Sequence, residues 1–169
     1  MSRPKKTKYY LDIALSVAKR SSCLRRNYGA VIVKNDEIIS TGFNGTPRGM
    51  FNCCDLGYCS KNAHNIPHGV GYEDYCNSAH AEMNAIIHAS RTEMLGSTLY
   101  LSGIDYETGQ LILNAEPCSI CFRMIVNAGI DLVVTLKKTG DGEFHDLYNG
   151  LVVKDIVNEM RREKIKERL

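Results

Sequence analysis

The fold of this chain is decided by two short stretches, His80-Ala81-Glu82-Met83-Asn84-Ala85-Ile86 and Pro117-Cys118-Ser119-Ile120-Cys121. One His and two Cys can fill three corners of a zinc tetrahedron and leave the fourth corner open for water. Each stretch continues into an apolar run, which predicts helices over about 80–91 and 118–128. We therefore expect His80, Cys118 and Cys121 to bind one Zn²⁺ ion between two neighbouring helix starts.

Glu82 follows His80 by two residues and adds a carboxylate to the predicted metal site. The pattern H-x-E followed by P-C-x-x-C is the signature of zinc-dependent nucleobase deaminases, in which the Glu acts as general acid and base. The partial positive charge of a helix start favours the thiolates that zinc requires. We therefore expect Glu82 to be catalytic. The alternative is a closed structural zinc site with a fourth protein ligand, in which Glu82 only complements the helix dipole.

The remainder of the chain reads as alternating helices and strands. Thr7 is expected to cap a helix over 7–20, and a charged helix is expected from about 147 to 169. Strands are expected at 29–34, 37–41, 97–102 and 132–136, with a tight turn at Asn35-Asp36 and a hairpin over 104–113 that turns at Thr108-Gly109. In the helix over 80–91, the inward stripe is expected to be Met83, Ile86, Ile87 and Ser90. This order implies an α/β layered fold.

Composition limits the kind of protein. At 169 residues, 44% of them hydrophobic and 24% charged, residues 1–169 fit one globular domain. A net charge of +2 is too small to indicate general binding to nucleic acid or membranes. No apolar run approaches the roughly 20 residues of a membrane helix, and no signal-peptide pattern follows the basic N-terminus. We therefore expect a cytoplasmic protein.

Both metal-site stretches resemble the cytidine/deoxycytidylate deaminase family, and the resemblance covers about residues 7 to 140. Three further stretches match the family: Gly29-Ala30-Val31-Ile32-Val33, Gly42-Phe43-Asn44-Gly45-Thr46-Pro47 and Asn127-Ala128-Gly129-Ile130. The stretch 42–47, together with Asn84, narrows the resemblance to the deoxycytidylate branch. The resemblance implies a three-layer α/β fold of the cytidine deaminase type, with a five-stranded mixed sheet flanked by helices. It also implies conversion of dCMP to dUMP and ammonia for thymidylate synthesis, with Asn44 contacting the deoxyribose. Family members are commonly homo-hexamers, activated by dCTP and inhibited by dTTP, with Mg²⁺ accompanying the nucleotide.

One segment departs from the family pattern. In the family, the strand at Leu99–Leu101 runs almost directly into the Pro-Cys motif, whereas here residues Gly103 to Glu116 intervene. We expect these residues to form an extra hairpin that alters the rim of the substrate pocket.

Five of the seven cysteines lie outside the Pro-Cys motif. The resemblance to bacterial and phage members implies a second, structural zinc ion in the irregular stretch 43–79, which is too long to be ordered without a clamp. The expected ligands are Cys23, Cys53, Cys59 and Cys76. Cys54 could replace Cys53, and His64 or His68 could replace a Cys. The alternative is that several are free thiols, with Cys23 a small apolar filler.

A nucleotide substrate requires cationic or amide donors for its phosphate. The candidates are Arg25, Arg26, Arg48 and Arg91, although a solvated surface position is the commoner fate of an Arg. Two other functions remain open at this point. One is deamination of a different base, such as cytidine, a riboflavin-pathway pyrimidine or tRNA adenosine. The other is a zinc-stabilised binding module without catalysis, for which Glu82 would be dispensable.

Overall fold

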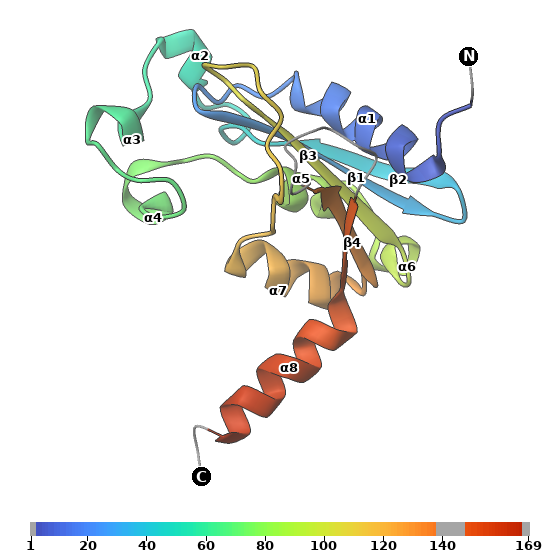
Figure 1. The fold of residues 1–169 in the computed structure, drawn as a ribbon. Coiled ribbons are helices and arrows are strands. Elements are labelled where there is room, and N and C mark those ends of the chain that lie inside the picture. The colour runs from blue at the N-terminus through green and yellow to red at the C-terminus, as the bar shows by residue number, and fades with distance from the viewer. Residues whose placement is uncertain (1–2, 138–147, 167–169) are drawn as a thin grey trace.

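The centre of the molecule is a five-stranded sheet with the order β2-β1-β3-β4-β5. The computed structural model describes residues 3–137 and 148–166. The strands are β1 (Arg26–Lys34), β2 (Glu37–Phe43), β3 (Thr98–Asp105), β4 (Leu132–Leu136) and β5 (Tyr148–Val152). β3 and β4 are parallel and all other neighbours are antiparallel, so the predicted mixed sheet is confirmed (Figure 1).

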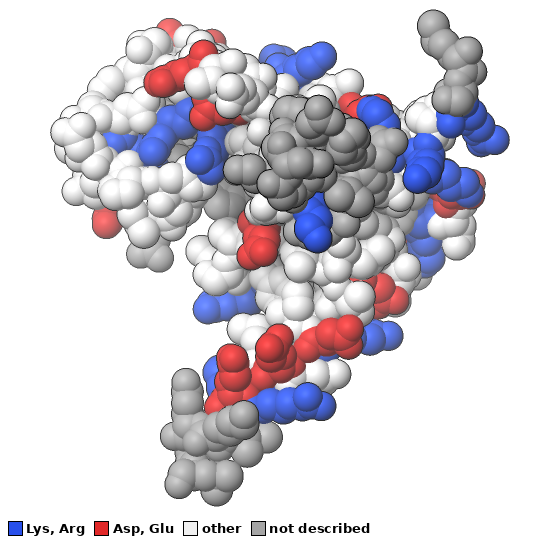
Figure 2. Space-filling view, in the orientation of Figure 1, with Lys and Arg blue, Asp and Glu red and all other residues white. Residues whose placement is uncertain are grey.

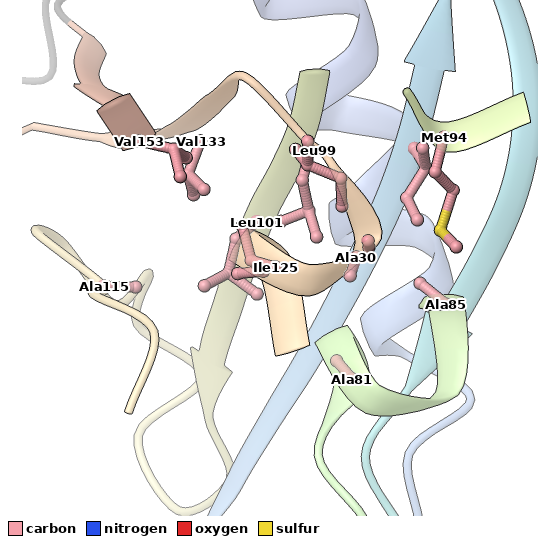
Figure 3. Close-up of a cluster of buried hydrophobic side chains, with 13 residues drawn as sticks. Ala30, Ala81, Ala85, Met94, Leu99, Leu101, Ala115, Ile125, Val133 and Val153 are labelled. Carbon is pink, nitrogen blue, oxygen red and sulfur yellow. The ribbon is translucent and has the colours of Figure 1, made fainter. Parts of the chain in front are cut away.

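Helices cover both faces of this sheet. Helix α1 (Lys6–Ala18) packs on one face, where Val31 and Val33 of β1 meet Tyr10 and Ala14. Helices α5 (Ala81–Ile87) and α7 (Ser119–Ala128) pack on the other face. There, alternate residues of the strands form the larger core with both helices, as Figure 3 shows for Ala30, Leu99, Ala85 and Ile125. Successive side chains of β1 point to opposite faces of the sheet, so the core is divided between the two faces. The predicted three-layer α/β fold is thus confirmed.

Two glycines allow the helices to approach the sheet closely. A Cβ built on Gly29 would lie 2.0 Å from the carbonyl oxygen of Ala14 in α1. A Cβ built on Gly42 would lie 2.2 Å from the backbone nitrogen of Ala85 and 2.3 Å from the carbonyl oxygen of Ala81, both in α5. Any larger residue at either position would push a helix away from the sheet. Gly42 therefore fixes the position of α5, which begins beside His80.

Local signals in the sequence correctly placed several boundaries. Asn35 and Asp36 have positive φ angles of 50° and 66° and join β1 to β2, as a two-residue hairpin turn requires. Gly129 ends α7 with a φ of 81°, and β4 has the predicted bounds. The hairpin after β3 is also confirmed, since Ile104 pairs with Leu111 and Gly109 has a φ of 67°.

Three expectations for the helices were wrong. Lys5, not Thr7, is the N-cap residue of α1, and no side chain caps this helix. The predicted helix over 80–91 ends at Ile87, because Ser90 opens a separate helix α6 (Arg91–Met94) with a capping box to Glu93. The buried residues of α5 are Ala81, Glu82 and Ala85. Of the predicted stripe, Ile86 does pack against the core, whereas Ile87 is 69% exposed and Ser90 lies outside the helix. The sequence did not indicate that Ala81 and Ala85 are the buried apolar residues, which follows from the close approach of Gly42 to the backbone of α5.

The C-terminal region begins with a strand that the sequence did not predict. β5 pairs with β4 and is followed by α8 (Val153–Lys166), which projects from the sheet (Figure 1). The predicted helix from about 147 to 169 is therefore too long at its start, and positions 147 and 167–169 lie outside the described residues. No helix within 3–137 or 148–166 is long and apolar enough to cross a membrane.

The segment 43–79 contains three short helices, α2 (Cys53–Leu56), α3 (Ser60–Ala63) and α4 (Tyr72–Tyr75). The two ends of the segment are held together by a pair of backbone hydrogen bonds between Gly45 and Ala79, 3.1 Å and 2.9 Å long. The short helices form a lobe beside the sheet (Figure 1). This lobe provides one wall of the cavity described below.

Candidate metal centre and active-site cavity

The starts of α5 and α7 bring three possible metal ligands together. His80 is the N-cap residue of α5, Cys118 is the N-cap residue of α7, and Cys121 lies in the first turn of α7. The His80 Nδ1 atom is 3.4 Å from the Cys118 Sγ atom and 3.3 Å from the Cys121 Sγ atom. Ligands bound at about 2.0–2.3 Å in a tetrahedron lie about 3.3–3.8 Å apart. The spacing and the soft N/S donor set therefore fit a zinc ion.

Hydrogen bonds within the cluster divide the protons unequally between the two sulfurs. The pKa of Cys118 is lowered to about 3, first because the Cys121 thiol hydrogen-bonds to it and then because His80 does so. The same bond, followed by burial, raises the pKa of Cys121. The pKa of His80 is raised, chiefly by its hydrogen bond to Cys118. Because metal ligands must be deprotonated, binding of a divalent cation would displace the Cys121 proton.

Glu82 is the only buried carboxylate among the residues with described burial, at 5% exposure. It lies in the first turn of α5, two residues from His80, and lines the cavity in front of the metal ligands. Burial is the largest cause of its raised pKa, which hydrogen bonds and the nearby His80 only partly offset. A carboxyl group that holds its proton more tightly than usual is suited to general acid and base catalysis.

A cavity of about 580 Å³ opens in front of these groups. Its walls come from the start of β1, from the lobe over 43–79 and from the starts of α5 and α7. The polar lining outside the metal centre includes Tyr28, Asn44, Lys61, His68 and Tyr72. A concave, partly apolar site with a few converging polar groups and perturbed pKa values is the usual form of a small-molecule site.

Asn44 is buried at 7% exposure and lines this cavity. Its Oδ1 atom accepts a hydrogen bond from the backbone N–H of Tyr28 at 2.7 Å, and its Nδ2 atom donates to the carbonyl of Arg26 at 2.9 Å. These bonds fix the amide against β1 and leave one N–H and one oxygen lone pair for a ligand. Contact of Asn44 with a deoxyribose stays a prediction.

The four candidate arginines separate into two pairs. Arg25 and Arg26 line the cavity. Arg48 and Arg91 are exposed and are not among the lining residues; Arg48 contacts the His88 ring at 3.3 Å, and Arg91 donates to the Asn127 carbonyl at 3.0 Å. The arrangement thus favours Arg25 and Arg26 over Arg48 and Arg91 as groups within reach of a bound phosphate.

The expected ligands of a second zinc ion converge on the cavity without forming a tight cluster. Cys23, Cys53, Cys59 and Cys76 all line it, and burial followed by the neighbouring sulfurs raises the pKa of Cys53. Across the described part of the chain, however, His80, Cys118 and Cys121 are the only group of three or more potential ligand atoms within 4.8 Å of one another. The second zinc ion stays a prediction, as does any part played in it by Cys54, His64 or His68.

The insertion after β3 folds back along the strand. The backbone N–H of Ile112 donates to the Gly103 carbonyl at 2.9 Å, and that of Asn114 donates to the Leu136 carbonyl at 2.7 Å. This path carries the chain to Glu116, which lines the cavity immediately before the Pro-Cys motif. The insertion therefore contributes to the cavity rim through Glu116.

Sequence reasoning missed the contribution of Lys61 to this cavity. Lys61 lies in a segment without hydrophobic periodicity, so nothing in the local pattern indicated that its side chain is buried. The only available signal was its position among the cysteines and histidines of the 43–79 segment.

Comparisons with known proteins agree with this geometry. Residues 4–137 match the family described as the cytidine and deoxycytidylate deaminase zinc-binding region. The chain is 35% identical over 145 residues to the deoxycytidylate deaminase of Mycobacterium phage D29, which covers 82% of this chain and 100% of that protein. It is also 35% identical over 148 residues to the deoxycytidylate deaminase of Schizosaccharomyces pombe, covering 87% of this chain but 39% of that protein.

Solved structures show the same similarity. The apo crystal structure of a dCMP deaminase from the cyanophage S-TIM5 has a TM-score of 0.55 and 27% identity, covering 82% of this chain and 88% of that chain. A structure of the cyanophage enzyme in complex with dCMP and dUMP has a TM-score of 0.54 and 26% identity, covering 79% of this chain and 82% of that one.

Proposed function

Because this chain belongs to the cytidine and deoxycytidylate deaminase family, we propose that it hydrolyses dCMP to dUMP and ammonia. The observation that carries this proposal is the cluster of His80, Cys118 and Cys121, of which His80 and Cys118 line the same cavity as the buried carboxyl group of Glu82. The similarity to phage deoxycytidylate deaminases supports dCMP as the substrate. The product would supply thymidylate synthesis.

The His80 Nδ1 atom and the two Sγ atoms of Cys118 and Cys121 would hold the zinc ion. When bound, zinc lowers the pKa of water and so supplies a nucleophile at neutral pH. Glu82 would take the proton of the attacking water at its carboxylate, deliver it to the ring nitrogen of the base, and then assist the departure of ammonia. The burial of Glu82 in the first turn of α5, two residues from His80, supports this role, because it places the carboxyl group beside the metal ligands where it can pass a proton between water and base.

Asn44 would orient the deoxyribose with the one N–H that its backbone hydrogen bonds leave available.

The resemblance to the family further supports a homo-hexamer, activation by dCTP, inhibition by dTTP, and Mg²⁺ bound with the regulatory nucleotide. It also supports a second, structural zinc ion held by Cys23, Cys53, Cys59 and Cys76. Metal analysis of fully active protein tests the second ion: two zinc ions per chain are expected, and one would overturn it.

Ammonia release from dCMP, dCTP, deoxycytidine and cytidine tests the substrate. We expect turnover of dCMP to exceed that of the other three, and to rise with dCTP and Mg²⁺ and fall with dTTP. Preferred turnover of another compound would replace dCMP as the substrate. No turnover of any of the four by zinc-loaded protein would favour another base or the non-catalytic binding module.

The Glu82→Gln variant tests the catalytic step. Loss of a general acid and base is expected to reduce kcat about 10²- to 10⁴-fold, while zinc content stays at the wild-type level because Glu82 is not a ligand. Glu107→Gln, which removes an exposed carboxylate in the hairpin turn, is the matched control and should be fully active. Wild-type activity in Glu82→Gln would refute the mechanism.

A further inference from the structure

Lys61 is a buried cation that the metal chemistry does not use. Its residue is 4% exposed, and its side chain lines the cavity from helix α3. Lysine is almost never fully buried unless its charge is paired. The position of Lys61 therefore requires either an internal partner or an anionic ligand.

The partners of Lys61 in the protein are uncharged. The Nζ atom donates a hydrogen bond to the Val70 carbonyl and lies 4.1 Å from the centroid of the Tyr72 ring. No described carboxylate lies within ion-pair distance of it. An ammonium group has three donors, so the carbonyl leaves donors that can reach an anion in the cavity.

Other cationic groups increase the positive charge on this side of the cavity. Arg25 and Arg26 line it together with Lys61, and Arg25 is held in place by a 3.1 Å hydrogen bond to the Ile66 carbonyl. Burial and then Arg25 lower the pKa of Lys61, and the nearby sulfurs of Cys76, Cys59 and Cys23 offset only part of this effect. Partial burial, followed by Arg26, Arg25 and Lys61, lowers the pKa of His68, although His68 remains exposed at the rim. Figure 2 shows basic side chains within the lobe that carries α2, α3 and α4.

The carboxylates that line the same cavity do not balance these charges at Lys61. Among the described lining residues they are Glu82, which belongs to the metal centre, and Glu116, which precedes the Pro-Cys motif. Concentrated charge in a partly desolvated site is unfavourable unless an opposite charge joins it. A ligand with a strongly anionic group would supply that charge.

One aromatic ring, that of Tyr72, lies between Lys61 and the candidate metal centre. The Tyr72 ring, over which the Lys61 Nζ atom lies, is in edge contact with the His80 ring at a centroid distance of 4.8 Å. A ligand whose base is at His80 and Glu82, and which extends along the Tyr72 ring, would therefore have its far end beside Lys61. In a nucleoside monophosphate, that far end is the 5′-phosphate.

We propose that Lys61 is a specificity-determining residue that binds the 5′-phosphate and thereby selects a nucleoside monophosphate over the nucleoside. This inference rests on the proposed deaminase function, because it assumes that the base occupies the metal end of the cavity. The phosphate would take donors of the Lys61 ammonium group that the Val70 carbonyl does not use.

Substrate discrimination in the Lys61→Met variant tests the proposal. A hydrogen bond to a charged group is worth about 10- to 100-fold in binding, so kcat/KM for dCMP should fall by that factor. The value for deoxycytidine should stay within about twofold of wild type, because it has no phosphate. Lys61→Arg should restore part of the preference for dCMP. Lys34→Met is the matched control, since Lys34 also donates to a backbone carbonyl, that of Thr92, but does not line the cavity.

A purely structural role for Lys61 predicts a different pattern. The proposal is overturned if Lys61→Met lowers kcat/KM for dCMP and for deoxycytidine by the same factor, or if it leaves the ratio of the two kcat/KM values unchanged. If that variant does not fold, protection of the wild-type Lys61 amine from acetylation decides the question by mass spectrometry. Inorganic phosphate should slow labelling of Lys61 but not of Lys34, and equal labelling with and without phosphate would overturn the proposal.

Failure of the proposed function remains distinguishable from failure of this inference. Wild-type protein that does not deaminate dCMP would remove the proposed function. Calorimetric binding of inorganic phosphate would then still be expected for wild type and lost in Lys61→Met. Equal phosphate binding by the two proteins, or none by wild type, would remove the role of Lys61.

Discussion

Replacing Gly42 by Ala should disturb the metal centre from a position outside it. The added Cβ would lie 2.2 Å from the Ala85 nitrogen, 2.3 Å from the Ala81 carbonyl oxygen and 2.8 Å from the Asn84 carbonyl carbon. All three atoms belong to the backbone of α5, so no side chain can rotate away. Since nonbonded atoms need about 3.5 Å, the helix must move from β2 by roughly 1 Å.

The expected cost has two parts. Overpacking of a well-packed core destabilises a protein by about 1–3 kcal/mol. In addition, α5 carries His80 and Glu82 at its start, so a shift of about 1 Å misplaces one metal ligand and the carboxyl group together. Misplacement of this size can reduce the rate about 10²-fold. We therefore expect lower zinc affinity and a fall in kcat/KM of about that size in the folded fraction.

Gly29→Ala provides the matched comparison. Its Cβ would meet α1 at 2.0 Å from the Ala14 carbonyl oxygen and 2.5 Å from the Ala18 nitrogen, an equally severe clash. Helix α1 carries no residue of the site, so this variant should lose stability while its zinc content and activity per folded molecule stay near wild type. Urea denaturation, metal analysis and steady-state kinetics are measured for both. Equal loss of zinc and activity in the two variants, or full activity in Gly42→Ala, would refute the reasoning.

Three further outcomes are expected. Ser90→Ala removes the capping box of α6 and should lower the free energy of unfolding by about 1 kcal/mol without changing kcat; an unchanged urea midpoint would contradict this. Ile125→Ala, at a fully buried core position, should cost about 2–5 kcal/mol, and a loss below 1 kcal/mol would show that the core collapses around the gap. The pKa of Glu82 in the folded state lies above its usual 4.5, so the folded state binds this proton more tightly than the unfolded state does. As pH rises above 4.5, metal-free wild type should therefore lose stability relative to metal-free Glu82→Gln. Parallel plots of unfolding free energy against pH for the two proteins would contradict this expectation.

The proximity of the candidate metal ligands was predictable because each residue type is tied to its chemistry and lies at the start of a helix. His80, Cys118 and Cys121 come together through two helix N-caps, a feature visible as short motifs. The turn at Asn35-Asp36 and the end of α7 at Gly129 were predictable for a similar reason, because few residues tolerate positive φ angles.

The parts that escaped prediction depend on contacts between distant segments. β5 exists because it pairs with β4, and its sequence Tyr148-Asn149-Gly150-Leu151-Val152 has weak strand character on its own. The burial of Lys61 depends on Val70, Tyr72 and the cavity wall, none of which leaves a periodic pattern. The capping box of Ser90 and Glu93 indicates that a new helix begins at Ser90, so that α5 must end before it. The predicted helix instead extended to position 91 because Ile86 and Ile87 continue the apolar pattern.

The pair of hydrogen bonds between Gly45 and Ala79 has a consequence for how enzymes of this shape can diversify. It closes the base of the loop that contains α2, α3 and α4, so the separation of the two ends at 45 and 79 is set independently of the length of the chain between them. The entropy of closing a flexible loop grows slowly, by about 0.6 kcal/mol for each doubling of length. Lineages can therefore lengthen, shorten or exchange this loop at little thermodynamic cost, and acquire new ligand preferences while inheriting the same reaction centre. A grafted loop from a relative, joined at 45 and 79, would be the corresponding engineering route.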